Sequence, residues 1–413
     1  MKLYRLGAII RRPLLECASP FTSGLLATCV YVSLAGLHGT PWRTSGHEYF
    51  NYLADAFLHG QLNLRVLPPA THDLVLYAGR YYLYWPPFPA VVLMPFVSVF
   101  GLTFSDVMFT AVLGGVDVGL VGLLLAQATQ RGILRLTDIQ RALLTVFFAF
   151  GTVLITLAPF GAVWCTAQLL GVGFVLLTYV SAISLPGGSA VVCAGLALAC
   201  AAATRNHLVF AGIWPGLYLW HEHAAKPRGV LLGWALAGTA PVVTAVVLLA
   251  LYNWARFGDP FNVGIRYHLA APFFRENFHR YGAFDIHYVL TNLYYQHIYY
   301  PFPIRADFYM GGSLWLLSPV FLAAFWGMAS DAPRWSRLGL IASILAVNVP
   351  ILLLMGTGWM QFGPRYTLDF VVPLILLTGM GLPKWRDGVT GVAVLISIVQ
   401  YAIGTAILIR AAV

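Results

Sequence analysis

Long apolar runs recur along the whole chain, and they restrict its fold more than any other feature. A helix needs about 20 apolar residues to cross the hydrocarbon core of a bilayer, and this sequence repeats runs of nearly that length with few charges inside them. Only 9% of its 413 residues are charged and 59% are hydrophobic, whereas soluble domains carry about 25% charged residues. The sequence therefore predicts an all-α polytopic membrane protein.

About eleven transmembrane helices are predicted from these runs. The runs are 21–37, 104–127, 143–158, 164–181, 190–203, 208–220, 230–251, 314–328, 338–355, 368–382 and 389–409. The stretch 190–220 is either two thin crossings or a hairpin that dips into the membrane, because the polar residues Thr204 to His207 interrupt it. The sequence contains no internal repeat and no separable soluble domain, so residues 1–413 are predicted to form one membrane domain.

The charges between the runs predict the orientation, because Lys and Arg collect in the cytoplasmic loops of membrane proteins. The segment 88–100 has only thirteen residues with two internal prolines, and runs of that length are more often interfacial than membrane-spanning. This choice places the basic loops on the side of the basic N-terminus: Arg131, Arg135 and Arg141; Lys226 and Arg228; Arg334 and Arg337; Lys384 and Arg386. We therefore predict a multi-pass protein of the cell membrane with a cytoplasmic N-terminus and large outer loops at about 38–103 and 252–313.

Charge and motif content call for no nucleic-acid partner and no cofactor. The net charge of +9 is explained by the basic cytoplasmic loops of a membrane protein. The five cysteines have no CxxC spacing, and no P-loop, G-x-G-x-x-G, HExxH or Cys/His zinc pattern is present. ATP hydrolysis and zinc proteolysis have no support, and a divalent metal is not indicated.

The most polar stretch between two apolar runs is 46–101. Glu48, Asn51, Asp55 and His59 recur at helical spacing with apolar residues opposite, which predicts an amphipathic helix in the membrane interface with its aromatic side in lipid. Seven residues of helix separate the two carboxylates by about 10 Å, too far to flank one scissile bond at about 5–9.5 Å. Either carboxylate could act alone as a general base, or both belong to an ordinary polar stripe.

Arginines stand at the ends of several apolar runs on the predicted outer side. A cation inside a span costs about 2.5–3.5 kcal/mol on insertion scales, so Arg205, which interrupts 190–220, is expected to face a partner or a wet cavity. The planar fork of arginine suits bidentate contacts with phosphate, although any single arginine can instead reach a lipid head group. The candidates for binding an anion are Arg80, which follows a predicted tight turn at Ala78-Gly79, together with Arg205, Arg256, Arg365 and the adjacent Tyr366.

Four stretches of the chain resemble the GT-C superfamily of integral-membrane glycosyltransferases. They are GHEYFNYLADAFLHGQLNL after the first run, YWPPFPAVVLMPFVSVFG before the second, and YNWARFGDPFNVG and QFGPRYTLDFVVP further on. The last two are similar to stretches of bacterial family-39-like and mannosyltransferase-like members. That family usually has Asp or an Asp-Glu pair just after the first span, where this chain has Gly46-His47 with Glu48 displaced by about one residue.

The resemblance implies transfer of a sugar from a polyprenyl-phosphate donor to a hydroxyl acceptor (a glycan, lipid or protein) at the outer face of the membrane. It implies a single displacement, with Glu48 as the first candidate base and Asp55 as the second. Because this chain has no acid pair suited to a divalent metal in these stretches, a metal-independent reaction is preferred. Arginines would hold the donor phosphate. The alternatives are a transporter or flippase for a lipid-linked saccharide, an O-antigen-type ligase or polymerase, and a non-catalytic assembly subunit.

Overall fold

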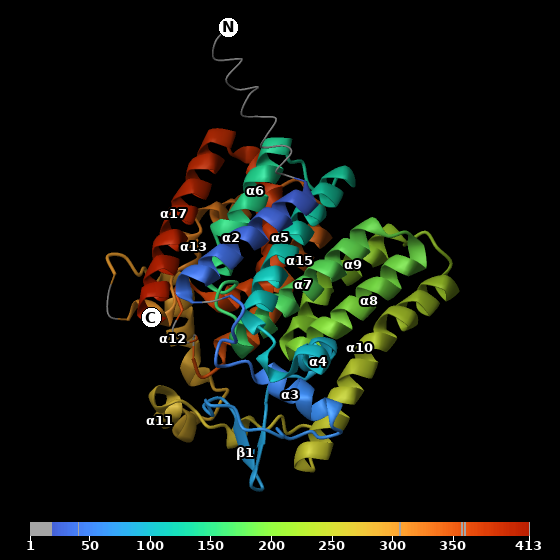
Figure 1. Ribbon diagram of the computed structural model, residues 1–413. Helices are drawn as coiled ribbons and strands as arrows, with labels where there is room; N and C mark the ends of the chain where they lie inside the picture. The colour runs from blue at the N-terminus through green and yellow to red at the C-terminus, as the bar shows by residue number, and fades with distance from the viewer. Residues whose placement is uncertain (1–18, 40, 305–306, 357, 359–360, 413) are drawn as a thin grey trace.

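The computed structural model describes residues 19–39, 41–304, 307–356, 358 and 361–412 of the chain, and it is almost entirely helical (Figure 1). Among these residues, nine helices are long and apolar enough to cross a membrane. The predicted fold class, an all-α polytopic membrane protein, is therefore confirmed. The basic N-terminal residues that entered the orientation prediction lie outside the described part.

The helices and strands follow one another along the chain as follows. The α-helices are α2 (Pro20–His38), α3 (Tyr49–Leu58), α4 (Phe88–Phe100), α5 (Asp106–Gln130), α6 (Asp138–Phe150), α7 (Ala162–Ser184), α8 (Gly187–Thr204), α9 (Ile213–Glu222), α10 (Arg228–Phe257), α11 (Pro272–Tyr281), α12 (Val289–Leu293), α13 (Leu314–Leu317), α14 (Ala323–Met328), α15 (Arg334–Leu352), α16 (Val371–Gly381) and α17 (Asp387–Ala412). The strands β1 (Val75–Tyr77) and β2 (Arg80–Tyr82) form a hairpin, and the short 3-10 helices η3 (Asn206–Gly212) and η9 (Arg365–Phe370) precede α9 and α16.

Two of the eleven predicted spans are not among the nine membrane-length helices of the described residues. The stretch 208–220 is divided between η3 and the ten-residue α9. The stretch 314–328 is divided between α13, a 3-10 turn that begins at Pro319, and α14, because proline lacks the N–H that would continue the preceding helix. The predicted interruption of 190–220 is confirmed, since α8 ends at Thr204 and Arg205 is its C-cap residue.

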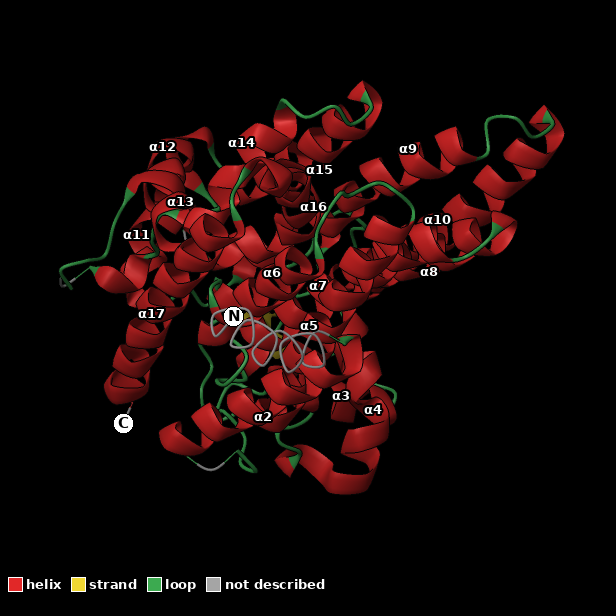
Figure 2. Ribbon diagram, turned by 90° about the horizontal axis from the view of Figure 1, so that it is seen from above, coloured by secondary structure: helices red, strands yellow, loops and turns green. Residues whose placement is uncertain are grey.

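Small residues let α10 lie directly against α8. In Figure 2 the helices α8, α9 and α10 lie together on one side of the bundle. A side-chain carbon added to Gly195 of α8 would lie only 2.1 Å from the carbonyl oxygen of Gly238 in α10, so two glycine backbones are in contact, as is typical of helices that associate in membranes. Along the rest of its length α10 is exposed or half-buried, and its buried residues are confined to the last two turns.

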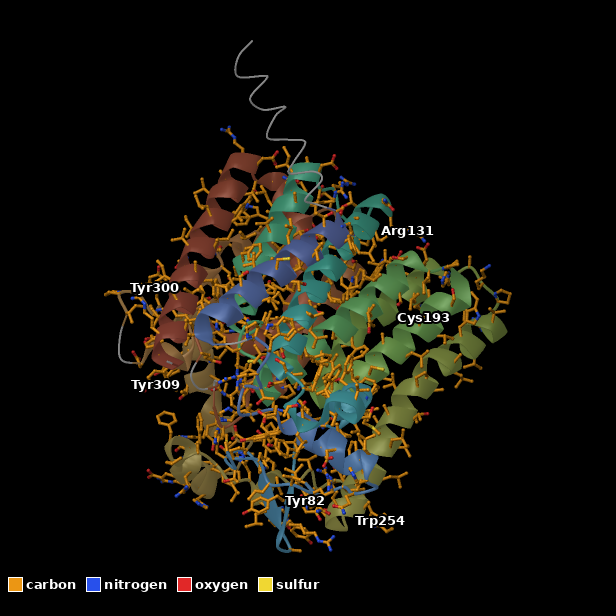
Figure 3. All side chains as sticks on the ribbon, in the orientation of Figure 1. Tyr82, Arg131, Cys193, Trp254, Tyr300 and Tyr309 are labelled. Atoms are coloured by element: carbon orange, nitrogen blue, oxygen red, sulfur yellow. The ribbon has the colours of Figure 1, made fainter. Side chains whose placement is uncertain are left out.

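Loops of opposite character lie at the two ends of the bundle. The hairpin, α3, α11 and the C-terminal end of α10 gather at the lower end in Figure 1. Figure 3 places Tyr82 and Trp254 at that end and Arg131, from the basic loop after α5, towards the other. This separation agrees with the predicted segregation of basic loops from the large polar loops. Which end faces the cytoplasm stays a prediction.

The first eight residues of helix α3 are buried, and only its last residue, Leu58, is exposed. The prediction that the aromatic face of this helix lies in lipid is therefore wrong for most of its length. Every residue from Tyr49 to Ala56 is buried, and Phe50 and Leu53 pack in a cluster that includes residues of α4 and α7. The polar side is also covered, because the Asn51 amide donates to the carbonyl oxygens of residues 102 and 104 at 3.3 and 2.8 Å. The short helix α4, predicted as a non-spanning interfacial segment, packs against the apolar side of α3.

The predicted tight turn at Ala78-Gly79 is confirmed. Both residues have positive φ angles, 49° and 73°, as a two-residue hairpin turn of type I′ requires. The hairpin also pairs with a distant segment, because Val75 forms an antiparallel bridge with His268 and Leu269 donates its N–H to the Leu74 carbonyl at 2.8 Å. This pairing brings residues almost two hundred positions apart to one surface.

The contact between α8 and α10 can be tested with Gly195→Ala. The added methyl group must push two backbones apart, and overpacking of this kind costs about 1–3 kcal/mol. We expect a lower midpoint of thermal unfolding in detergent. Gly233→Ala in α10 is the matched control, because nothing lies within 4 Å of the added carbon, and it should leave the midpoint unchanged or raise it. Equal midpoints for the two variants would contradict the close contact.

Candidate functional site

A cavity of about 760 Å³ lies at the end of the bundle that carries the hairpin. Its size is within the range of about 300–1,000 Å³ that is usual for small-molecule sites. One wall is formed by residues that follow α8 and open η9, and another by the segment before β1 together with His268. Most of the remaining lining is aromatic or aliphatic. The arrangement is that of a binding site with polar groups on two walls.

The first wall carries two arginines, of which one is paired with a carboxylate and the other is not. Arg205 donates from Nη2 to Oδ2 of Asp369 at 2.7 Å, and the Asp369 side chain is completely buried. Arg365 donates from Nη2 to the Tyr366 hydroxyl at 3.0 Å, and within the described part of the chain no carboxylate pairs with it. Its Nε is buried without a partner among these residues. Because a buried charge is costly unless it is paired, this guanidinium is suited to receive an anion.

Tyr366 and Gln168 hold this wall in place. Both guanidinium groups lie over the Tyr366 ring, with the central carbon of Arg365 4.7 Å and that of Arg205 5.6 Å from the ring centroid, so both cations contact its π system. The Gln168 amide donates to the Arg365 carbonyl at 2.8 Å and to Oδ1 of Asp369 at 3.1 Å. The positions of both arginines are therefore fixed by contacts with other side chains.

The second wall presents a carboxylate oriented by a histidine. Nε2 of His268 lies 2.9 Å from Oδ1 of Asp73, and because an ionised carboxylate can only accept, Nε2 carries the hydrogen. The imidazole is 2% exposed, whereas the carboxylate is 25% exposed and lines the cavity. Asp73 also has a positive φ of 68°, which is uncommon for a residue other than glycine and is often found at functional sites.

Aromatic side chains and a neutral phenol lie between the two walls. Burial raises the pKa of Tyr84 well above its usual value, and the charge of Asp73 raises it further, while Arg365 and Arg205 oppose the shift. Tyr84 stacks on Trp85 with ring centroids 3.9 Å apart. The phenol therefore stays protonated beside charges of both signs, and both rings line the cavity.

Two histidines extend the second wall. The rings of His47 and His72 lie edge to face with centroids 4.8 Å apart, and both line the cavity. Burial lowers the pKa of His47, and the neighbouring His72 lowers it further, although Asp73 acts in the opposite direction. His47 is therefore mostly neutral near pH 7. In the described residues, no group of three or more His, Cys, Asp or Glu side chains is arranged as a metal site.

The structure brings together three of the predicted site residues: Arg205, Arg365 and Tyr366 line the same cavity. The two predicted bases lie outside its lining. Glu48 precedes α3, is 6% exposed, and has one carboxylate oxygen without a partner within the described residues. Asp55 accepts two hydrogen bonds from Arg65, at 2.9 and 3.0 Å. Their role as base stays a prediction, and their location gives it no support.

Arg80 and Arg256 also lie outside the lining. Arg80 is exposed at the start of β2, next to the hairpin turn. The Arg256 guanidinium is buried and donates to the Leu83 carbonyl and to Oδ1 of Asn253, both at 2.7 Å, and it covers the Tyr252 ring at 3.8 Å. Arg256 thus ties the end of α10 to the segment after β2. A phosphate contact by either arginine stays a prediction.

Sequence reasoning missed four polar groups that line the cavity beside the arginines: His47, Asp73, His207 and His268. It also missed Asp369, which is completely buried behind the arginine wall. The one usable signal nearby was the tight turn at Ala78-Gly79, which follows Asp73 by a few residues and was predicted from the sequence. The pairing of Asp73 with His268 had no local signal, since 195 residues separate them. The same holds for the contacts of Asp369.

No protein-family model matches the sequence, and no curated protein matches it. The fold is similar to that of ArnT from Cupriavidus metallidurans in the apo state, with a TM-score of 0.51 and 16% identity over 89% of this chain and 61% of that chain. The structure of ArnT bound to undecaprenyl phosphate gives a TM-score of 0.49 and 16% identity, over 88% of this chain and 60% of that one. The Archaeoglobus fulgidus oligosaccharyltransferase in its apo form gives a TM-score of 0.45 and 12% identity, over 95% of this chain and 56% of that one.

The similarity to ArnT in the apo state supports the predicted GT-C-like arrangement of helices at the level of the fold alone. The chain spans less than two thirds of the length of each neighbour. At 16% identity or lower the similarity describes the arrangement of helices, and the chemistry has to be argued from the cavity.

The buried carboxyl of Glu48 gives a pH-dependent prediction. Burial raises the pKa of Glu48 above the usual glutamate value, and the charge of Asp106 contributes, while hydrogen bonds from Thr44 and the backbone oppose the rise. Because the folded pKa is above the unfolded one, ionisation reduces the free energy of unfolding as pH rises through the folded value. We expect Glu48→Gln to unfold at a higher temperature than the wild type near about pH 8, and at a similar temperature near about pH 4.

Thermal unfolding of the purified proteins in detergent measures this difference. Glu276→Gln is the control, because Glu276 is exposed on α11 and its substitution should give the same small difference at every pH. A wild-type advantage over Glu48→Gln that grows with pH would contradict the expectation.

Proposed function

We propose that the protein is a membrane glycosyltransferase that moves a sugar from a polyprenyl-phosphate donor to a hydroxyl acceptor at the outer face of the membrane. The observation that carries the proposal is one cavity whose lining contains both Arg365 and Asp73. Arg365 is half-buried, its Nε is buried without a partner among the described residues, and no described carboxylate pairs with it, while Asp73 is a carboxylate oriented by His268. The motifs quoted from the sequence imply the same class of reaction, and the fold is compatible with it.

The donor phosphate is assigned to the arginine wall. Arg365 supplies the charge that has no described carboxylate partner, and Arg205, held by Asp369, stands beside it. Arginine cannot be neutralised by deprotonation, and its fork matches two phosphate oxygens. The apolar part of the lining, which includes Phe274, Phe284 and Leu354, suits the first units of the prenyl chain.

The sugar is placed against the aromatic rings between the walls. Tyr84 and Trp85 form a stacked pair, and Trp164 lies beside His47 with ring centroids 5.1 Å apart. Flat apolar faces bury the C–H side of a sugar ring, and the protonated phenol of Tyr84 can donate to a sugar hydroxyl. This placement puts the anomeric carbon between the phosphate and Asp73.

Asp73 is assigned as the general base. With Oδ1 engaged by His268, Oδ2 takes the proton of the acceptor hydroxyl, and the acceptor oxygen forms a bond to the anomeric carbon. The bond from that carbon to the phosphate oxygen breaks, and its electron pair stays on the departing polyprenyl phosphate, where the arginines stabilise the charge. A single displacement inverts the anomeric carbon.

Two substitutions test these assignments. Asp73→Asn removes the base, and general base catalysis contributes about 10²- to 10⁴-fold. Arg365→Gln removes charge stabilisation at the leaving group, for which losses of about 10²- to 10³-fold are typical. We expect both to lower kcat/KM by at least about 100-fold, measured as acceptor-dependent release of polyprenyl phosphate by purified protein from a panel of polyprenyl-phosphate sugars.

Arg275→Gln, on the exposed surface of α11, is the control and should keep wild-type activity. Glu48→Gln and Asp55→Asn belong in the same series, because a loss confined to one of them with Asp73→Asn fully active would return the base to α3. Movement of the lipid-linked sugar between membrane leaflets without release of polyprenyl phosphate would favour a flippase and contradict the proposal.

A further inference from the structure

His207 lies on the arginine wall and is oriented by the same carboxylate as Arg205. Nε2 of His207 is 2.8 Å from Oδ2 of Asp369, and the imidazole is 18% exposed while the carboxylate is completely buried. Because the carboxylate only accepts, Nε2 carries the hydrogen. Nδ1 has no hydrogen bond to any described residue, and it is the one polar ring atom that His207 can offer to the cavity that it lines.

The cavity thus has two carboxylate–imidazole pairs that differ in which partner is the more exposed. In the pair Asp73–His268 the carboxylate is the more exposed partner, at 25% against 2%, so that pair offers a proton acceptor. In the pair Asp369–His207 the imidazole is the more exposed partner, at 18% against 0%, so that pair offers a ring nitrogen beside the guanidinium groups. A displacement needs a base on one side and hydrogen-bond donors at the leaving group on the other, and the free ring nitrogen of His207 is a donor when the imidazole is protonated.

We propose that His207 is a catalytic residue that, as an imidazolium held by Asp369, donates a hydrogen bond from Nδ1 to the leaving phosphate and stabilises the second negative charge that this phosphate acquires. The inference rests on the proposed function and adds a third group to the phosphate site. No proton has to leave His207. The electron pair of the broken bond goes to the phosphate oxygen, and the N–H bond points at it.

The charges of the wall support this assignment. The donor is a phosphodiester with one negative charge, whereas the released polyprenyl phosphate is a monoester with a charge of about −1.5 to −2 at pH 7. Arg205 and Arg365 against Asp369 leave one net positive charge, which matches the donor. A proton on His207 adds a second positive charge, which matches the transition state and the product. An interaction of this kind raises kcat more than it lowers KM.

A purely structural role for His207 would have a different signature. If the imidazole only helped Asp369 to hold Arg205, its loss would weaken the binding of donor and product alike. His207→Gln separates these cases, because the glutamine amide nitrogen can occupy the place of Nε2 and keep the bond to Asp369 while the Nδ1 donor and its charge are lost. The Arg205–Asp369 pair is then undisturbed.

The experiment measures kcat and donor KM by release of polyprenyl phosphate, together with the inhibition constant and direct binding of undecaprenyl phosphate as the probe. For His207→Gln we expect kcat to fall about 10- to 100-fold, with donor KM within about threefold of wild type and the affinity for undecaprenyl phosphate about tenfold weaker. Asp369→Asn, which also disturbs Arg205, should in addition raise donor KM. His279→Gln, an exposed residue of α11, should behave as wild type.

Wild-type turnover in His207→Gln would overturn the inference, as would parallel losses of donor and product affinity. A wild-type protein that binds undecaprenyl phosphate in a His207-dependent way but transfers no sugar would instead overturn the proposed function and leave the anion contact of His207 standing. If His207→Gln lowered kcat but kept the wild-type affinity for undecaprenyl phosphate, the inference about His207 would also be overturned, because the charge that His207 stabilises is present in the product.

Discussion

One completely buried carboxylate, that of Asp369, holds together the segments that form the arginine wall. It accepts hydrogen bonds from Arg205, His207 and Gln168, and so it joins the end of α8, the start of η3, and α7 to the turn that opens α16. A buried ion pair that loses one partner costs about 3–5 kcal/mol, so these segments cannot separate easily. The positions of the cavity's charged groups depend on this junction.

The opposite wall has a different origin. It is made of loops, and it is held by backbone pairing between the strand that begins at Val75 and the segment around His268. That pairing places Asp73 over the cavity with its φ in an unusual region. A helical bundle fixes one wall and a small extended structure at its end fixes the other. Charges of both signs are thereby held in a partly apolar cavity, where their interactions are stronger than in water.

Part of this arrangement could be predicted from the sequence. The cost of burying a charge identified Arg205 as a residue that must face a partner or a cavity, and it does both. Arg365 and Tyr366 were placed in the same site on the strength of their position at the mouth of an apolar run. The choice of Glu48 or Asp55 followed helical periodicity, which shows which residues share a face of a helix but not what covers that face. Here α4 and neighbouring segments cover it.

The sequence by itself determined the apolar character of the long helices, the interruption after Thr204 and the tight turn at Ala78. Each of these is a local consequence of hydropathy, of charge or of backbone sterics. Only the tertiary structure decided which buried polar groups meet. Asp369 is 162 residues from His207, and Asp73 is still further from its histidine. Periodicity places a side chain on its own element, and a pairing over such a distance is set by how the elements pack together.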